Sequence, residues 1–276
     1  MKKNILPFSV LMSVYYYDNP LFFDQALSSV FNQTVLPDEL VLVVDGPIPE
    51  RTKDVIHRFR KSYNLIIIWL DVNVGHGNAK RVGLERCHYN LVAIMDSDDI
   101  CDAYRFEKQL YCFSSNDKLS VVGGAISEFL TDTNISVGKR ILPSNHDDIV
   151  SFLKLRCPMN HMTVMFKKSD VQMAGGYLDW HHNEDYYLWI RMYEKGCVFM
   201  NLEDVLVYAR VGLEFYKRRG GWKYFISEKK IQQYMLSQKI ISKFRFVKNI
   251  IVRFFVQVMM TDNLRQFIFK KYFRSK

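Results

Sequence analysis

The stretch Leu91-Val-Ala-Ile-Met-Asp-Ser-Asp-Asp-Ile100 determines how the rest of this chain is interpreted. Its apolar first half, Leu91 to Met95, predicts a buried strand. The strand ends abruptly at three carboxylates, Asp96, Asp98 and Asp99. Carboxylates this close repel one another, and burial of an unpaired charge is costly. We therefore expect a positive group beside them, and a hard cation such as Mg²⁺ or Mn²⁺ suits carboxylate oxygens. The alternative is that the acids only cap the next helix.

Strands and helices alternate along the first hundred residues. Strands are predicted at residues 8–15, 39–44, 65–70 and 91–95, and helices at 20–32, 49–63 and 79–87. This alternation is typical of βαβ units, so the sequence predicts an α/β fold with a mostly parallel, Rossmann-like sheet covered by helices. The second half is less regular. Helices are expected there at 104–113, 147–155, 169–174 and 184–195, and strands at 119–125, 162–166 and 198–208.

The charge is unevenly placed along the 276 residues. The chain is 49% hydrophobic and 24% charged, which is a globular composition. Its formal net charge is +9, yet residues 217–276 hold sixteen Lys and Arg against two acids, so the remainder is negative. We place a boundary near Gly220-Gly221 and expect a main domain over residues 1–220. A basic amphipathic helical tail, with one or two helices from about residue 228, is expected over residues 221–276.

Cysteine usage and hydropathy favour a cytoplasm-like compartment. The five cysteines form no CxxC pair, and an odd count at these spacings is typical of reduced thiols. Lys2 and Lys3 resemble the start of a signal peptide, but Pro7 and two serines interrupt the apolar run after them, and we interpret residues 8–15 as a strand. No stretch reaches the roughly 18 uncharged apolar residues of a membrane span. We therefore expect a chain that does not cross a bilayer.

Further polar groups follow the other predicted strands. Asp45 ends the strand 39–44, where an acid can accept hydrogen bonds from a nucleotide base or ribose, although Asp45-Gly46 also fits a plain turn. The loop Asn73-x-Gly75-x-Gly77 lacks the Walker A pattern and the third glycine of a dinucleotide fingerprint. Lys80 and Arg81 follow it, and such cations either reach a diphosphate or lie on a solvated helix face.

The segment His181-His-Asn-Glu-Asp185 precedes an apolar, aromatic helix. Zinc is disfavoured because HExxH is absent and no cysteine is near. A carboxylate here could act as a general base if it reaches a substrate hydroxyl. The alternative is an acid that caps the helix.

Taken together, these motifs resemble the family 2 glycosyltransferases, the inverting GT-A type that build bacterial polysaccharides. The resemblance covers about residues 8 to 210. It looks most similar to the cytoplasmic transferases of O-antigen, capsule and exopolysaccharide gene clusters. The resemblance rests on the segments Ser9-Val-Leu-Met-Ser-Val-Tyr15, Val43-Val-Asp-Gly46, Asn73-x-Gly75-x-x-x-Ala79-x-x-x-Gly83, Met95-Asp-Ser-Asp-Asp99 and Glu184-Asp-Tyr-Tyr-Leu-Trp189.

The resemblance implies a donor side within a nucleotide half, about residues 1–100. There Asp45 would bind the nucleotide base, with Tyr15 lining that pocket. Asp96 would touch the ribose or the metal, and Asp98 would ligate Mg²⁺ or Mn²⁺ on the diphosphate of a nucleotide sugar, most commonly a UDP-sugar. Lys80 stands where many members carry Arg, and Arg81 replaces the Asn that follows it, so the diphosphate cation, for which Lys80 is a candidate, departs from the family's pattern.

The resemblance also implies an acceptor half, about residues 101–220. Asp185 would deprotonate the acceptor hydroxyl, and Glu184 would hold the acceptor or assist. The QxxRW motif of processive synthases is missing, which favours one sugar added per encounter. The expected acceptor is a glycan linked through diphosphate to a polyprenyl lipid.

Aromatic residues interleave the cations of the tail, which fits an interfacial helix on an anionic membrane. We therefore expect a cytoplasmic protein, peripheral on the inner face of the cell membrane. Packing of the tail on the main domain is the alternative, and nucleic acid is disfavoured because no nucleic-acid motif accompanies the charge. For the whole chain, the competing functions are a sugar-phosphate nucleotidyltransferase and a non-catalytic basic adaptor.

Overall fold

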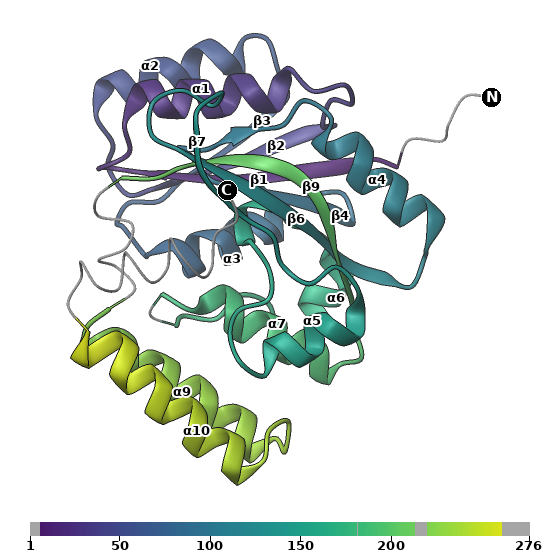
Figure 1. Cartoon of the computed structure of the whole chain (residues 1–276). Helices are drawn as coiled ribbons and strands as arrows, with labels where there is room; N and C mark the ends of the chain where they lie inside the picture. The colour runs from purple at the N-terminus through teal and green to yellow at the C-terminus, as the bar shows by residue number, and fades with distance from the viewer. Residues whose placement is uncertain (1–5, 181, 213–219, 261–276) are drawn as a thin grey trace.

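A computed structural model describes residues 6–180, 182–212 and 220–260 of the protein (Figure 1). Its strands are β1 (Phe8–Tyr15), β2 (Glu39–Asp45), β3 (Leu65–Trp69), β4 (Leu91–Met95), β5 (Ile100–Cys101), β6 (Leu119–Phe129), β7 (Ser136–Arg140), β8 (Met165–Lys167) and β9 (Val198–Arg210). Its helices are α1 (Pro20–Phe31), α2 (Glu50–Arg60), α3 (His76–Arg86), α4 (Arg105–Ser115), α5 (His146–Leu153), α6 (Lys168–Met173), α7 (Glu184–Glu194), α9 (Trp222–Ser237) and α10 (Lys243–Phe254). Two short turns of helix, η1 (His161–Thr163) and η2 (Phe255–Met259), complete the described elements.

The strands form a single mixed, mostly parallel sheet. The order is β3-β2-β1-β4-β8-β6-β9-β5, and β7 pairs with β6. Strands β3, β2, β1 and β4 are parallel neighbours, as are β6 and β9, whereas β8 runs antiparallel to β4 and β6. The predicted α/β fold is therefore confirmed. Two strands were not predicted: β5 is only two residues long, and β7 is mostly exposed and lacks an apolar alternation.

Helices cover both faces of the sheet, which explains why its central strands are continuous apolar runs. In β1, Val10 and Met12 pack into the core on the side of α1, α2 and α4. Leu11, between them, packs into the core on the side of α3, α5, α6 and α7. Figure 1 shows α1 and α2 on one face and α3 on the other.

Helix α3 begins at His76, three residues before the predicted start. Gly75 has φ +87°, a left-handed conformation that suits glycine, and it is the N-cap of the helix. Asp45 accepts hydrogen bonds from the backbone N–H groups of Val74 and Gly75. This tertiary contact holds the loop in place. The helix can therefore start within residues 73–78, which the two glycines had predicted to be a loop.

The described part of the basic tail packs on the main domain. Helices α9 and α10 form a hairpin beside α7 (Figure 1), and Ile231 and Met235 of α9 are fully buried in the core that contains α7. The alternative prediction, that the tail packs on the main domain, is therefore correct for residues 222–260. The rest of the predicted tail, residues 261–276, lies outside the described residues. Among the described helices, none is both long enough and apolar enough to cross a membrane.

A substitution of Gly83 is expected to disturb this packing. A Cβ atom at Gly83 would lie 2.3 Å from Leu11 Cδ1 and 2.7 Å from Val43 Cγ2, so α3 lies too close to the sheet for any side chain. We expect Gly83→Ala to lower the free energy of unfolding by about 1–3 kcal/mol. Urea unfolding measures this, and Gly212→Ala, where a Cβ meets open space, is the control. Equal midpoints for the two variants would contradict this account of the contact.

Candidate active site

The carboxyl ends of three parallel strands bring the predicted donor-side residues to one edge of the sheet. Tyr15 of β1 pairs in register with Asp45 of β2, and Met12 pairs with Met95 of β4. Asp96 follows Met95 directly, so the three predicted residues Tyr15, Asp45 and Asp96 share this edge. It is the edge at which α/β sheets bind ligands.

Asp45 organises the loop that leads into α3. Its carboxylate is buried and accepts hydrogen bonds from Val74 N at 2.7 Å, Gly75 N at 3.1 Å and Asn73 Nδ2 at 3.0 Å. These donors occupy much of the carboxylate's hydrogen-bonding capacity. Asp45 therefore holds the loop at this edge of the sheet, and its contact with a base stays a prediction, as does that of Tyr15.

Lys80 supplies the positive charge expected beside the carboxylates. It is fully buried, whereas its neighbour Arg81 is exposed. Its ammonium lies 3.9 Å from Asp96 Oδ1 and 3.4 Å from the Met95 carbonyl oxygen. Burial lowers the pKa of Lys80, while Asp96 acts to raise it. The solvated-face interpretation of Lys80 is therefore wrong, and its predicted contact with a diphosphate stays a prediction.

Asp98 lies in a cluster of acids that includes Asp18, which the sequence analysis missed. Asp18 accepts hydrogen bonds from Ser97 Oγ at 2.8 Å and Tyr15 N at 3.1 Å. Burial and then the charges of Asp96 and Asp18 raise the pKa of Asp98 to about 6. Burial also raises the pKa of Asp18. The signal for Asp18 was present, because this acid follows β1 at the same sheet edge.

Asp99 has a structural role. It is buried, and its Oδ1 accepts a hydrogen bond from Arg210 N at 2.8 Å, which ties the segment after β4 to the end of β9. Burial and then the charge of Asp98 raise the pKa of Asp99 well above its ordinary value. Of the three carboxylates in the opening stretch, two are therefore available to a ligand.

The side chains around Asp96 fit a divalent cation. His76, Asp96 and His161 each offer a ligand atom, and these atoms lie within 4.8 Å of one another. Burial lowers the pKa of His76 to about 4 and that of His161 to about 3, so both imidazoles are neutral and can donate a lone pair near neutral pH. Asp98 lies outside this group, and the charge of Asp96 acts on it. Carboxylate oxygens suit Mg²⁺ or Mn²⁺, whereas imidazole nitrogens suit later transition metals. The sequence predicts Asp96 and Asp98 as metal ligands, and the two histidines reach Asp96 only through the fold.

The two acids at the start of α7 face different parts of the site. Glu184 Oε1 lies 3.6 Å from His76 Nδ1, so Glu184 faces the donor side. Asp185 Oδ2 accepts a hydrogen bond from Cys157 Sγ at 3.5 Å, and Asp185 lines a cavity of about 660 Å³ together with His161. Burial and then the charge of Asp185 raise the pKa of Glu184 to about 7. The structure thus places one carboxylate beside His76 and the other in the cavity.

The raised pKa of Glu184 has a consequence for stability. The folded protein keeps a proton up to about pH 7 that the unfolded chain releases near 4.5. The free energy of unfolding should therefore fall as pH rises through this window, by on the order of 2–3 kcal/mol. Glu184→Gln, which cannot ionise, should reduce the fall and leave the part that Asp98 and Asp99 contribute, since their pKa values are also raised. Urea unfolding at about pH 5 and pH 8 in EDTA measures it, and an unchanged pH dependence in the variant would contradict the assignment.

Comparison with known proteins identifies the family. The model of glycosyl transferase family 2 matches residues 9–173. The chain is 38% identical over 264 residues to the amylovoran biosynthesis glycosyltransferase AmsE of Erwinia amylovora, covering 96% of this chain and 98% of that protein. It is also 38% identical over 267 residues to the UDP-Gal:alpha-D-GlcNAc-diphosphoundecaprenol beta-1,3-galactosyltransferase of Escherichia coli, covering 97% and 96%.

Solved structures agree with the fold. The structure of S. aureus TarS in complex with UDP-GlcNAc superposes with a TM-score of 0.67 at 17% identity, covering 91% of this chain and 73% of that one. The mannosyltransferase PcManGT from Pyrobaculum calidifontis, in complex with GDP-Man and Mn²⁺, gives 0.61 at 14% identity, covering 92% and 71%. The chain belongs to glycosyl transferase family 2: it is a glycosyltransferase with the GT-A fold, related to enzymes of bacterial surface-polysaccharide biosynthesis. This membership decides against the nucleotidyltransferase and the adaptor.

Proposed function

We propose that this protein transfers one hexose, galactose in the first instance, from its UDP-sugar to a hydroxyl of a sugar linked through diphosphate to a polyprenyl lipid. The observation that carries the proposal is the 38% identity to the galactosyltransferase of E. coli, which extends over 96% or more of both chains. The geometry supports it, because donor-side and acceptor-side carboxylates lie on two sides of the start of α7.

On the donor side, Asp96 and Asp98 would hold Mg²⁺ or Mn²⁺, with His76 and His161 close enough to contribute. Such a cation neutralises the negative charge of a departing nucleoside diphosphate. Lys80 keeps Asp96 ionised: burial acts to raise the pKa of Asp96, but the Lys80 ammonium is the largest of the charges that hold it below its ordinary value. Asp45 keeps the neighbouring loop in the conformation that opens α3.

On the acceptor side, Asp185 is the proposed general base. The Cys157 thiol donates to one of its oxygens, and Tyr186 N donates to the other at 2.7 Å. Burial and then the charge of Asp185 raise the pKa of Cys157 well above its ordinary value, so the thiol keeps its proton. Asp185 would take the proton of the acceptor hydroxyl as that oxygen attacks the anomeric carbon. A single displacement of this kind inverts the anomeric centre and needs no covalent enzyme intermediate.

The test is transfer itself. Purified protein is incubated with Mn²⁺, a synthetic GlcNAc-diphospho-alkyl acceptor and, in separate reactions, UDP-galactose, UDP-glucose and UDP-GlcNAc. We expect one added hexose, with the β configuration from an α-linked donor, by mass spectrometry and NMR. A folded protein that transfers from none of the three donors would refute the proposal.

We also propose that the protein acts at the inner face of the cell membrane, where a polyprenyl-linked acceptor resides. Exposed apolar side chains of α10, with neighbouring cations, support this placement. Sedimentation with anionic vesicles, compared with vesicles of neutral lipid, tests it. Equal sedimentation with both would contradict a role for the basic charge.

A further inference from the structure

The cavity that Asp185 lines ends against the C-terminal hairpin. Its volume is about 660 Å³, and one wall comes from the segment that contains Leu155, Cys157 and Met159. The opposite wall is one face of α10 and η2: Lys248, Asn249, Val252, Arg253, Val256 and Gln257. These residues recur at one-turn spacing, so the hairpin presents a whole helical face to the acceptor side of the active site.

Buried hydrogen bonds hold this wall in place. Asn249 Nδ2 donates to the Lys154 carbonyl oxygen at 2.9 Å and to Gln232 Oε1 at 2.8 Å. The guanidinium of Arg253 pairs with the Glu228 carboxylate and donates to the carbonyl oxygen of the neighbouring Leu155. Loss of a partner from a buried charged pair is costly. The hairpin is therefore a positioned part of the site.

Cations outnumber acids among the described residues that line the cavity. The cations are Arg140, Arg156, Lys248 and Arg253, and the acids are Asp185 and Glu228, the latter paired with Arg253. His161 adds no charge near neutral pH, because burial lowers its pKa to about 3. Such an excess of cations favours an anionic ligand, and guanidinium and ammonium groups are suited to phosphate.

An apolar path leads out of the cavity along α10. Val252 lines the cavity and is 51% exposed. The exposed side chains of Phe244, Val247 and Ile251 follow at helical spacing on the adjoining face of the same helix. A ligand with an anionic head and an apolar chain would fit both parts, with its chain leaving the cavity over this face.

We propose that this cavity binds the diphosphate of a lipid-diphosphate-linked acceptor, with Lys248 and Arg156 as phosphate ligands and Val252 beside the first part of the lipid chain. The inference rests on the proposed function and adds the place where the acceptor's phosphates lie. The acceptor sugar would then lie at Asp185. The hairpin then forms a wall of the acceptor site, in addition to the membrane contact proposed for it above.

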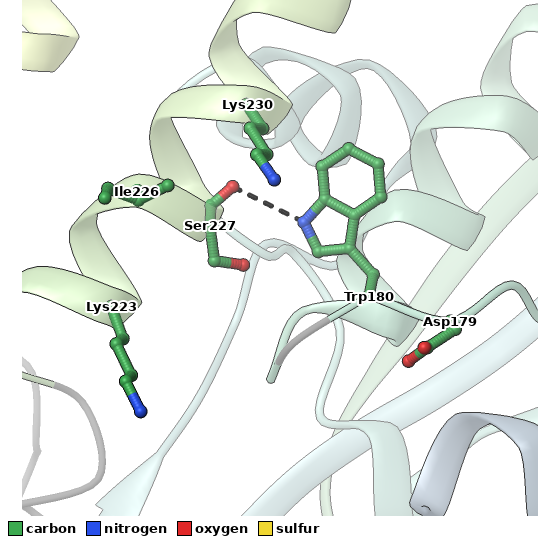
Figure 2. A pocket seen from close by; sticks show the side chains of 6 residues that line it. All are labelled: Asp179, Trp180, Lys223, Ile226, Ser227 and Lys230. Atoms are coloured by element: carbon green, nitrogen blue, oxygen red, sulfur yellow. Dashed lines mark hydrogen bonds between the residues drawn. The ribbon is translucent and has the colours of Figure 1, made fainter.

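A second cavity provides the control. Figure 2 shows Lys223 and Lys230 of α9 around Trp180, whose Nε1 donates to the Ser227 carbonyl oxygen at 3.4 Å. This cavity shares no described lining residue with the one that contains Asp185. Lys230 is exposed, like Lys248, and belongs to the same hairpin. A change at Lys230 therefore alters the charge of the hairpin without touching the proposed diphosphate site.

The experiment compares Lys248→Glu with Lys230→Glu in the full chain, without vesicles or detergent. The acceptors are GlcNAc-diphosphate carrying a short alkyl chain and the alkyl glycoside of GlcNAc without phosphate, the latter assayed as a competitive inhibitor. For Lys248→Glu we expect the KM of the diphosphate acceptor to rise roughly tenfold, as loss of a hydrogen bond to a charged group predicts. The kcat, the UDP affinity and the inhibition constant of the phosphate-free glycoside should stay unchanged. Lys230→Glu should change none of these quantities.

Each other outcome has a definite meaning. If the wild type transfers to no acceptor, the proposed function fails. If it transfers and Lys248→Glu leaves the KM unchanged, or weakens both acceptors equally, the diphosphate assignment is wrong. If Lys230→Glu raises the KM as much as Lys248→Glu does, the effect comes from the overall charge of the hairpin, and the assignment of the diphosphate site to Lys248 is wrong. Lys248→Gln, with unchanged UDP affinity and a smaller rise in KM, confirms that the charge and not misfolding is measured.

Discussion

Asp185→Asn is expected to lower kcat by about 10²- to 10⁴-fold, the usual contribution of a positioned general base. Asparagine keeps the size of the side chain and the oxygen that can accept from Tyr186 N, at present 2.7 Å from the carboxylate. It cannot take a proton from the acceptor hydroxyl. The affinity for UDP should stay unchanged, because the Asp185 side chain lines the acceptor cavity. Initial rates at saturating donor and acceptor, together with calorimetric titration of UDP, measure the two quantities.

Asp179→Asn is the matched control for Asp185→Asn. Asp179 is exposed and lines the other cavity, beside Trp180, so the variant removes one nearby acid without touching the proposed base. Its kcat should equal that of the wild type. A variant Asp185→Asn that keeps its turnover would show that another group, Glu184 first of all, removes the proton.

The second large effect is expected at Asp98. Removal of this carboxylate should weaken the metal-dependent binding of UDP by about 3 kcal/mol, or roughly 100-fold, because a metal ion contributes several kcal/mol of charge stabilisation at such a site. Asp98→Asn should fold normally, since Asp98 keeps an exposed surface although neighbouring groups partly desolvate its carboxylate, and the change removes a charge that Asp96 and Asp18 repel. Titration of UDP with Mn²⁺ and with EDTA separates the metal-dependent part of the affinity from the rest.

The same site predicts a pH dependence of metal binding. Burial, Asp96 and Asp18 raise the pKa of Asp98 to about 6, so protons should compete with the cation below that pH. The Mn²⁺-dependent part of the UDP affinity should fall as pH decreases through 6 and should be largely independent of pH in Asp98→Asn. Asp54→Asn on the distant helix α2 removes the same charge and should behave as the wild type. Retention of Mn²⁺-dependent UDP binding in Asp98→Asn would exclude Asp98 as a metal ligand.

Much of the fold could be predicted because the hydrophobic pattern is strong. The apolar runs of β1, β2 and β4 are buried on both faces, and such runs mark central parallel strands from the sequence alone. Their order could not be deduced in the same way. β8 lies antiparallel between β4 and β6, and no local pattern shows which strands pair across 70 residues or more of chain.

The common position of three acids could be predicted because residue type and strand end coincide there. Asp45, Asp96 and Asp98 follow apolar runs directly, so their common edge could be inferred. His161 could not, because it lies in a short helical turn of the second half and reaches Asp96 only through the fold. The burial of Lys80 could not be predicted either, because a single cation on a helix does not reveal that its helix packs against the sheet.

The sequence by itself determined the class of fold, the family and the presence of acids at the carboxyl ends of the strands, because these depend on local hydrophobic pattern and short motifs. Only the tertiary structure decided what each charge faces. It buried Lys80 beside Asp96, directed Glu184 toward His76 and Asp185 into the cavity that His161 also lines, and placed the basic hairpin against that cavity. Burial and long-range neighbours set the partners and the pKa of a charged group, and both arise only when distant segments pack together.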